Sequence, residues 1–314
     1  MIDGGLLFSY PGSKWRLAPR FQQHYPPHRA FVDVFGGSAA LIARQAPAAV
    51  EVYNDLDSDV FNVFSTVKNP AGCEDVLRLL ETTPNNREQY DACKRILADT
   101  NESSIRRAWA FVVAGTIGFA GHPAVAYGWS QPDWHRLDLA NLSAKVRWWH
   151  DRLKRVRLEN RPWQEIVALY DAPDTFFACD PPYLAEVLRC AADRYYQHQM
   201  GVDAHVELIE RLRKIKGYAL ICGYNHPLYT RMIFHWRKVS FFAREAMGSR
   251  VGKRSEVVWL NYEDDGSKVE ENRLRIAQRY VQIMGGDEDA ARYLERIKRL
   301  RRLLDDDHRQ VVQA

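Results

Sequence analysis

The amino-acid sequence predicts an α/β fold in which a mostly parallel sheet carries helices on both faces. Short apolar runs typical of buried strands alternate with amphipathic helical patterns, and several of these runs end directly at Gly, Asp or Pro. A third observation is an interruption of roughly a hundred residues between the second and third runs, far more than one crossover helix requires. It predicts a helical lobe inserted into the sheet domain.

The expected strands are short and regularly bounded. Five of them occupy residues 30–35, 49–54, 156–160, 175–179 and 218–223, and two further runs at 239–244 and 256–261 predict a C-terminal β-hairpin. Helical patterns follow the first strand at 38–45 and precede the fifth at 203–216. Strands that alternate with helices in this way favour parallel pairing.

The predicted domain organisation follows from the interruption. Residues 1–56 and 150–265 form the sheet domain, and 57–149 form the inserted lobe, helical over 57–115 and rich in Gly, Pro and aromatic residues over 116–142. Residues 266–314 are charged and helical, with a break at Gly285 and Gly286, which predicts a helical hairpin appendage. Its apolar positions suit packing or self-association better than contact with nucleic acid.

Composition excludes several classes of protein. The chain has 314 residues, 46% of them hydrophobic, with a net charge of +4 and a pI near 8.7, which permits a polyanionic partner without requiring one. Five cysteines without a C-x-x-C pair favour a reducing cytoplasm over a disulfide framework or a zinc site. No apolar run reaches the ~20 residues of a membrane span. We therefore expect a soluble cytoplasmic protein without membrane contact or bound metal.

The stretch "FFACDPPYLAE" at 176–186 carries the first candidate site. An apolar strand ends at Asp180, and Pro181 and Pro182 lack the N–H groups that would continue the ladder. Because ligands of open α/β sheets lie beyond the carboxyl ends of the strands, we expect a rigid corner that presents Asp180 and Tyr183 to a cleft. Taken alone, the stretch is equally typical of an ordinary loop with a packed tyrosine.

Two neighbouring strand ends indicate an adenosine-containing ligand. Phe35 is followed by Gly36 and Gly37, which allow close backbone approach before a helix, and Asp55 lies at the tip of the next strand, where an acid accepts the ribose hydroxyls. The alternatives are a plain βα turn and a helix N-cap. Neither G-x-G-x-x-G nor G-x-x-x-x-G-K-[ST] is present, so a cofactor without a pyrophosphate fits best, and S-adenosyl-L-methionine is the common one.

The ordered set of motifs resembles the adenine-specific DNA methyltransferases of the D12, Dam-like type, including phage-borne relatives. The order is Tyr-Pro-Gly-Ser-Lys at 10–14, Asp-x-Phe-Gly-Gly-Ser at 33–38, Tyr-Asn-Asp at 53–55, a long insertion, Asp-Pro-Pro-Tyr at 180–183 and "RSEVVWLNY" at 254–262. This resemblance implies a Rossmann-like methyltransferase sheet with an inserted target-recognition lobe. The chain departs from the family's Phe-x-Gly-x-Gly at Ala39, which puts cofactor affinity in question.

The resemblance also implies residue roles. Asp180 and the Pro181 carbonyl would accept the two N6 hydrogens of a flipped adenine in double-stranded DNA, and Tyr183 would stack on the base. The implied catalytic residues are Asp180, Pro181, Pro182 and Tyr183, and the implied cofactor-binding residues are Tyr10, Lys14, Phe35, Gly36, Gly37, Asp55 and Asp180. No metal is required.

DNA contacts are predicted from basic residues in and near the lobe and from the hairpin. The candidates are Arg106, Arg107, His122, Arg136, Arg250 and Lys253, although a solvated charged face is the commoner role for any one of them. Two alternative functions stay open from the residues. One is the same chemistry on cytosine N4, RNA adenine or a protein glutamine, and the other is an inactive relative that binds cofactor or DNA.

Overall fold

The computed structural model describes residues 5–117, 139–187, 198–242 and 255–263. The chain divides into two compact units, of which the first comprises Met1–Phe21 with His28–Glu263 and the second Gln22–Pro27 with Asp264–Ala314. Within the second unit the structure describes a single turn of 3₁₀ helix, η1 (Gln22–His24). The predicted C-terminal helical hairpin lies outside the described residues, as does the predicted turn of the β-hairpin at 247–254.

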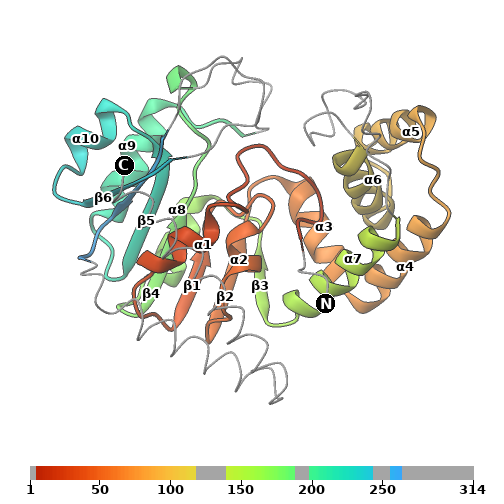
Figure 1. Cartoon of the computed structure of the whole chain (residues 1–314), viewed down its shortest axis with the longest axis horizontal. Coiled ribbons are helices and arrows are strands. Elements are labelled where there is room, and N and C mark those ends of the chain that lie inside the picture. The colour runs from red at the N-terminus through yellow and green to blue at the C-terminus, as the bar shows by residue number, and fades with distance from the viewer. Residues whose placement is uncertain (1–4, 118–138, 188–197, 243–254, 264–314) are drawn as a thin grey trace, which may run out of the picture. The chain divides into compact units, whose positions relative to one another are not determined.

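The described strands form one seven-stranded sheet in the order β3-β2-β1-β4-β5-β7-β6, which can be followed in Figure 1. The parallel strands are β1 (Ala30–Asp33), β2 (Val50–Asn54), β3 (Val156–Glu159), β4 (Thr175–Cys179) and β5 (Tyr218–Tyr224). The last two, β6 (Arg237–Phe242) and β7 (Ser255–Leu260), are antiparallel. The predicted α/β class and the mostly parallel sheet with its hairpin are confirmed.

The strand order reverses between β1 and β4. β1 pairs with β2 along one edge and with β4 along the other, so that Asp33 lies level with Tyr53 and Ala178. The chain therefore leaves these neighbouring strand ends in opposite directions, which opens a crevice beyond them. The first strand ends two residues earlier than predicted, because Val34 and Phe35 already belong to the glycine turn.

Alternate residues of each strand face opposite layers of helices. Val32, Phe177 and Ile221 share one core with three helices, α8 (Trp163–Tyr170), α9 (Val202–Leu212) and α10 (Pro227–Met232). On the other face, the ring of Tyr53 packs 5.0 Å from that of Phe64 in α3 (Ser58–Lys68). The short helices α1 (Ala18–Phe21) and α2 (Ala40–Arg44) contact each other. This period of two explains how a short, fully buried strand serves two cores.

The described residues of the insertion are mainly helical over 58–117, as the pattern at 57–115 predicted. The insertion contains α4 (Pro70–Glu81), α5 (Arg87–Ala98) and α6 (Ser104–Ile117), and the chain returns to the sheet through α7 (Leu139–Leu153). α3 and α7 each contact β3 as well as the lobe helices, so both parts share these two helices. The helical group can be followed in Figure 1 from α3 to α7.

A buried ion pair fixes α7 to the sheet. The guanidinium of Arg152 donates to both carboxylate oxygens of Glu51 in β2, at 2.7 and 2.6 Å, and to the carbonyl of Ile42 at 2.7 Å. The Glu51 side chain is 1% exposed, so breaking this bidentate pair would leave a buried charge. The end of the insertion is thereby held on β2, the strand that leads to Asp55.

Candidate active site

A cavity of about 290 Å³ lies beyond the carboxyl ends of β1, β2 and β4. Five segments contribute most of its lining: residues 10–14, 33–38, 54–57, 161–164 and 198–200. The seven residues predicted to bind a cofactor all line it, namely Tyr10, Lys14, Phe35, Gly36, Gly37, Asp55 and Asp180. Tertiary structure therefore gathers into one cavity motifs that are far apart in the sequence.

The glycine turn is dictated by sterics. A Cβ on Gly36 would lie 2.1 Å from the Tyr53 ring, and one on Gly37, whose φ is +49°, would lie 2.9 Å from the Tyr10 ring. Ala39 also has a left-handed backbone, with φ 53°. An alanine there costs about 1–2 kcal/mol relative to right-handed backbone, a cost that glycine avoids. The turn thus forms despite the alanine, and α2 begins at residue 40 rather than at the predicted residue 38.

Asp55 is fixed by backbone donors at the edge of the cavity. Its Oδ2 accepts a hydrogen bond from the Gly37 N–H at 2.7 Å, and its Oδ1 accepts one from the Asp57 N–H at 2.8 Å. The N-cap of α3 is Asp57, which accepts from the N–H groups of Asp59 and Val60. Asp55 is therefore not the cap. Burial raises the pKa of Asp55 to about 6, although the two N–H donors oppose the shift.

Lys14 and Asp180 form a buried ion pair at the centre of the site. The ammonium lies 2.9 Å from Asp180 Oδ2, and the lysine side chain is 4% exposed. Burial acts to lower the pKa of Lys14, but the carboxylates of Asp180 and Glu256 outweigh burial and hold that pKa above its ordinary value. Among the described residues, the other oxygen, Asp180 Oδ1, is buried and has no hydrogen-bond partner. One oxygen is clamped, and the other is available as an acceptor.

A second buried acid, Asp33, was not identified as a site residue from the sequence. It ends β1, lines the cavity and is 1% exposed, and neither carboxylate oxygen has a partner among the described residues. Burial raises the pKa of Asp33 well above its usual range, and Asp180 and Asp55 raise it further. The detectable signal was a single acid within the apolar strand "AFVDVF". Such an orphaned group indicates a missing donor or cation.

The Asp-Pro-Pro-Tyr corner is supported by His205, which sequence reasoning also missed. The imidazole Nε2 lies 3.0 Å from the Pro182 carbonyl, and Nδ1 lies 2.7 Å from the Tyr229 hydroxyl. A carbonyl only accepts, so Nε2 carries the proton and Nδ1 accepts from Tyr229. Burial lowers the pKa of His205 to about 4, which keeps the ring neutral. In the sequence, His205 was only one residue of the amphipathic helix predicted at 203–216, and no motif singled it out.

Tyr183 does not line the cavity. Its side chain is buried, its hydroxyl donates to Glu256 Oε2 at 2.5 Å, and the Lys14 ammonium lies 4.9 Å from the centre of its ring. Tyr224 packs edge-on against the ring at 4.9 Å. The predicted corner therefore presents Asp180 and Pro182 to the cavity, while Tyr183 lies behind Lys14.

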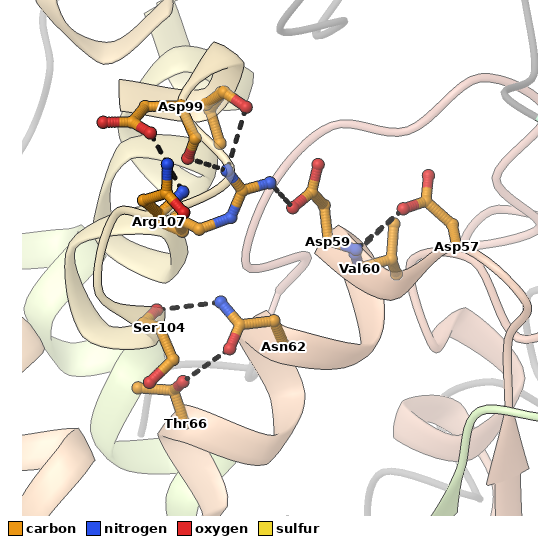
Figure 2. A network of polar contacts seen from close by, with 10 residues as sticks. Asp57, Asp59, Val60, Asn62, Thr66, Asp99, Ser104 and Arg107 are labelled. Atoms are coloured by element: carbon orange, nitrogen blue, oxygen red, sulfur yellow. Dashed lines mark hydrogen bonds and ion pairs between the residues drawn. The ribbon is translucent and has the colours of Figure 1, made fainter. Parts of the chain in front are cut away.

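The two predicted DNA contacts that the structure describes differ in environment. Arg106 is 52% exposed and pairs with Glu102 one turn away. Arg107 is 17% exposed, and its guanidinium contacts Asp59 of α3 and donates to the carbonyls of Leu97 and Asp99. Figure 2 shows Arg107 reaching from α6 to the first turn of α3, with Asn62 joining the same helices through Ser104. Arg107 thus has a structural task. His122, Arg136, Arg250 and Lys253 lie outside the described residues.

The described residues contain no group of three or more His, Cys, Asp or Glu side chains arranged to hold a metal ion. Within the same residues, no helix has both the length and the apolar character that a membrane crossing demands. What the cavity offers instead is two buried carboxylates with unpaired oxygens, one lysine and a tight glycine turn. The unsatisfied carboxylate oxygens fit a ligand that carries positive charge and hydrogen-bond donors.

Comparison with known proteins places the chain in a family. Its residues 10–234, more than half of the chain, match the family model described as D12 class N6 adenine-specific DNA methyltransferase. No curated protein matches the chain. The matched range includes the glycine turn, Asp55 and the Asp-Pro-Pro-Tyr corner. This chain is a member of the D12 class of N6 adenine-specific DNA methyltransferases.

Proposed function

We propose that this DNA adenine methyltransferase uses S-adenosyl-L-methionine and acts on N6 of an adenine rotated out of duplex DNA. The observation that carries the proposal is the state of Asp180. One of its oxygens is held by Lys14 at 2.9 Å, and the other is buried, without a partner among the described residues, at the cavity that Asp55 and the glycine turn share. A preorganised acceptor next to an adenosine-binding geometry supports transfer to an amino group.

The cavity residues divide the tasks of holding the cofactor. Asp55 keeps lone pairs for the ribose hydroxyls, since each of its oxygens accepts one backbone N–H. Gly36 and Gly37 allow close backbone approach, and the buried oxygens of Asp33 offer hydrogen-bond acceptors to an ammonium group, whose charge would in turn favour the ionised acid. When bound, S-adenosyl-L-methionine supplies a methyl group on a positively charged sulfur.

Asp180 activates the target nitrogen by accepting hydrogen bonds rather than by removing a proton first. The adenine amine is a poor nucleophile because its lone pair is delocalised into the ring. When Asp180 Oδ1 and the Pro181 carbonyl accept the two N6 hydrogens, the nitrogen becomes pyramidal and its lone pair points away from them. With a methyl donor bound, the new N–C bond would form as the bond between the methyl carbon and the sulfur breaks and its electron pair stays on the sulfur. The methylated nitrogen would then give one hydrogen as a proton to the Asp180 carboxylate that already accepts it. Lys14 keeps the acceptor oriented, because it holds Oδ2 of the same carboxylate.

Base stacking on Tyr183 requires a local rearrangement. The ring is 6% exposed, and the Lys14 ammonium lies over it, so a base cannot stack there unless the groups that cover the ring move. Adjustments of this size accompany many binding events.

We also propose that the exposed Arg106 contacts a DNA phosphate. The free, buried state of Cys73, Cys93, Cys179 and Cys222 supports the proposal of a reducing cytoplasm.

The test is a methylation assay with labelled S-adenosyl-L-methionine and unmethylated duplex DNA. We expect label in N6-methyladenine, and we expect Asp180→Ala to lower the turnover by about 10²- to 10⁴-fold when assayed below its melting temperature, which falls because the buried Lys14 loses its partner. Asp151→Ala removes an exposed acid that pairs with Lys154 and serves as the matched control, with unchanged turnover. Label in another base or in protein, or an active Asp180→Ala enzyme, would contradict the proposal.

A further inference from the structure

Glu256 holds the far end of the Tyr183 side chain. It lies in β7 opposite Tyr224 of β5, and it is 8% exposed. Its Oε2 accepts the Tyr183 hydroxyl at 2.5 Å, a length typical of the strong bonds that a hydroxyl donates to a carboxylate. The two residues are 73 positions apart, so the bond joins the catalytic corner to the hairpin.

The protonation of the two groups fixes the direction of this bond. Burial raises the pKa of the Tyr183 hydroxyl well above its ordinary value, and Asp180 and Glu256 raise it further, so the tyrosine keeps its proton and donates. Burial also raises the pKa of Glu256, while Lys14 and the tyrosine hydroxyl oppose that shift. The phenol is therefore the donor and the glutamate the acceptor.

Tyr183 and Asp180 are held as one unit. Lys14 pairs with Asp180 at 2.9 Å and lies over the Tyr183 ring at 4.9 Å, while Tyr224 supports the ring edge at 4.9 Å and 72°. The hydroxyl oxygen lies on the axis about which a tyrosine ring turns, so the bond to Glu256 fixes the position of the far end of the ring, and with it the χ1 angle, while packing limits the rotation of the ring. If the cover moves aside for a base, Glu256 is the contact that keeps the ring in place.

We propose that Glu256 is a positioning residue for the target base: through the Tyr183 hydroxyl it fixes the ring on which the adenine stacks, and so sets the distance from the amine to Asp180. The proposal rests on the proposed function. It concerns orientation and not cofactor affinity, because Glu256 does not line the cavity. Small errors in such placement lower the rate of the chemical step much more than they lower affinity.

The decisive experiment is a double-mutant cycle of Tyr183→Phe and Glu256→Ala on the full chain. Tyr183→Phe keeps the stacking ring and removes only the hydroxyl. We expect each single variant to lower the single-turnover rate about 10- to 100-fold, and the double variant to be no slower than the slower single variant. Cofactor affinity from calorimetry and duplex affinity from anisotropy should stay within about threefold of wild type.

Two further variants separate positioning from general loss of structure. Glu256→Gln keeps an acceptor for the hydroxyl and should recover part of the rate lost in Glu256→Ala. Tyr170→Phe removes the same kind of bond away from the corner, from the Tyr170 hydroxyl to Glu159 at 2.7 Å, and should turn over as wild type does.

The outcomes decide between the hypotheses. Near-normal rates in Tyr183→Phe, or rate losses that add in the double variant, would overturn the role of Glu256. If Glu256→Ala does not fold, Tyr183→Phe and Glu256→Gln decide alone. A wild-type enzyme that labels no adenine contradicts the proposed function itself, whereas an active wild type with unaffected variants contradicts only this inference.

Discussion

At the scale of single residues, the site depends on which lone pairs are already used. Asp57 caps α3, which leaves Asp55 for a ligand, and Lys14 holds one oxygen of Asp180, which leaves the other. At the corner, His205 donates to the Pro182 carbonyl and so uses one of its lone pairs. The neighbours of the site therefore determine which acceptor oxygens stay available to a ligand.

His205 makes the corner sensitive to acid. Its pKa is lowered to about 4 by burial, against about 6.5 in an unfolded chain, so its stabilising contribution is complete above pH 6.5 and is lost as the pH falls through 4. We expect wild type to lose roughly 3 kcal/mol more free energy of unfolding between pH 7 and pH 4 than His205→Gln, which does not titrate. Denaturant titrations at several pH values measure the difference, and equal acid sensitivity of both proteins would refute this account.

At the scale of elements, α3 joins the cavity to the lobe. Its cap, Asp57, donates a backbone N–H to Asp55, and Asp59 in its first turn contacts Arg107 of α6. Figure 2 shows the contact of Asp59 with Arg107 and, beside it, the bond from the Val60 N–H to the cap Asp57. The same element therefore positions the proposed ribose acceptor and carries the helices of the insertion.

Arg107 and Arg106 provide a matched pair of variants. Arg107→Ala leaves two carbonyls and Asp59 without their partly buried donor, and we expect a loss of about 2 kcal/mol in the free energy of unfolding. Arg106→Ala removes an exposed ion pair with Glu102, one helical turn away, and should lower the free energy of unfolding by less than about 0.5 kcal/mol. Denaturant unfolding of both proteins measures these two losses in free energy. Similar losses would show that the contacts of Arg107 with Asp59 and the two carbonyls do not stabilise the fold.

At the scale of the whole molecule, ligand binding should raise the free energy of unfolding. The cavity lies among β1, β2 and β4, so a ligand that fills it contacts the central strands of the sheet. We expect S-adenosyl-L-methionine at 100 times its Kd to raise the free energy of unfolding by about 2.7 kcal/mol. Asp55→Ala should remove most of this gain at the same ligand concentration. Absence of a thermal shift in wild type would argue against the cavity as the cofactor site.

The sequence determined much of the fold and half of the site. Alternation of apolar strands with helical patterns predicted the parallel sheet, because a strand buried on both faces must be apolar throughout. Gly36 and Gly37 were predicted because glycine permits a tight turn, Asp180 because the two prolines after it end the strand, and Asp55 because it follows the end of a strand. Strand ends shifted by one or two residues where the glycine turn began earlier than the apolar run ended.

Only the tertiary structure decided which groups these residues meet. The partners of Tyr183 and of the Pro182 carbonyl are 73 and 23 residues away, on other elements, and the pairing of Lys14 with Asp180 spans most of the sheet domain. Sequence patterns report local backbone preferences and burial. Both oxygens of Asp33 and Oδ1 of Asp180 lack a partner within the part of the chain that the structure describes, and this results from long-range packing, which buries them away from water.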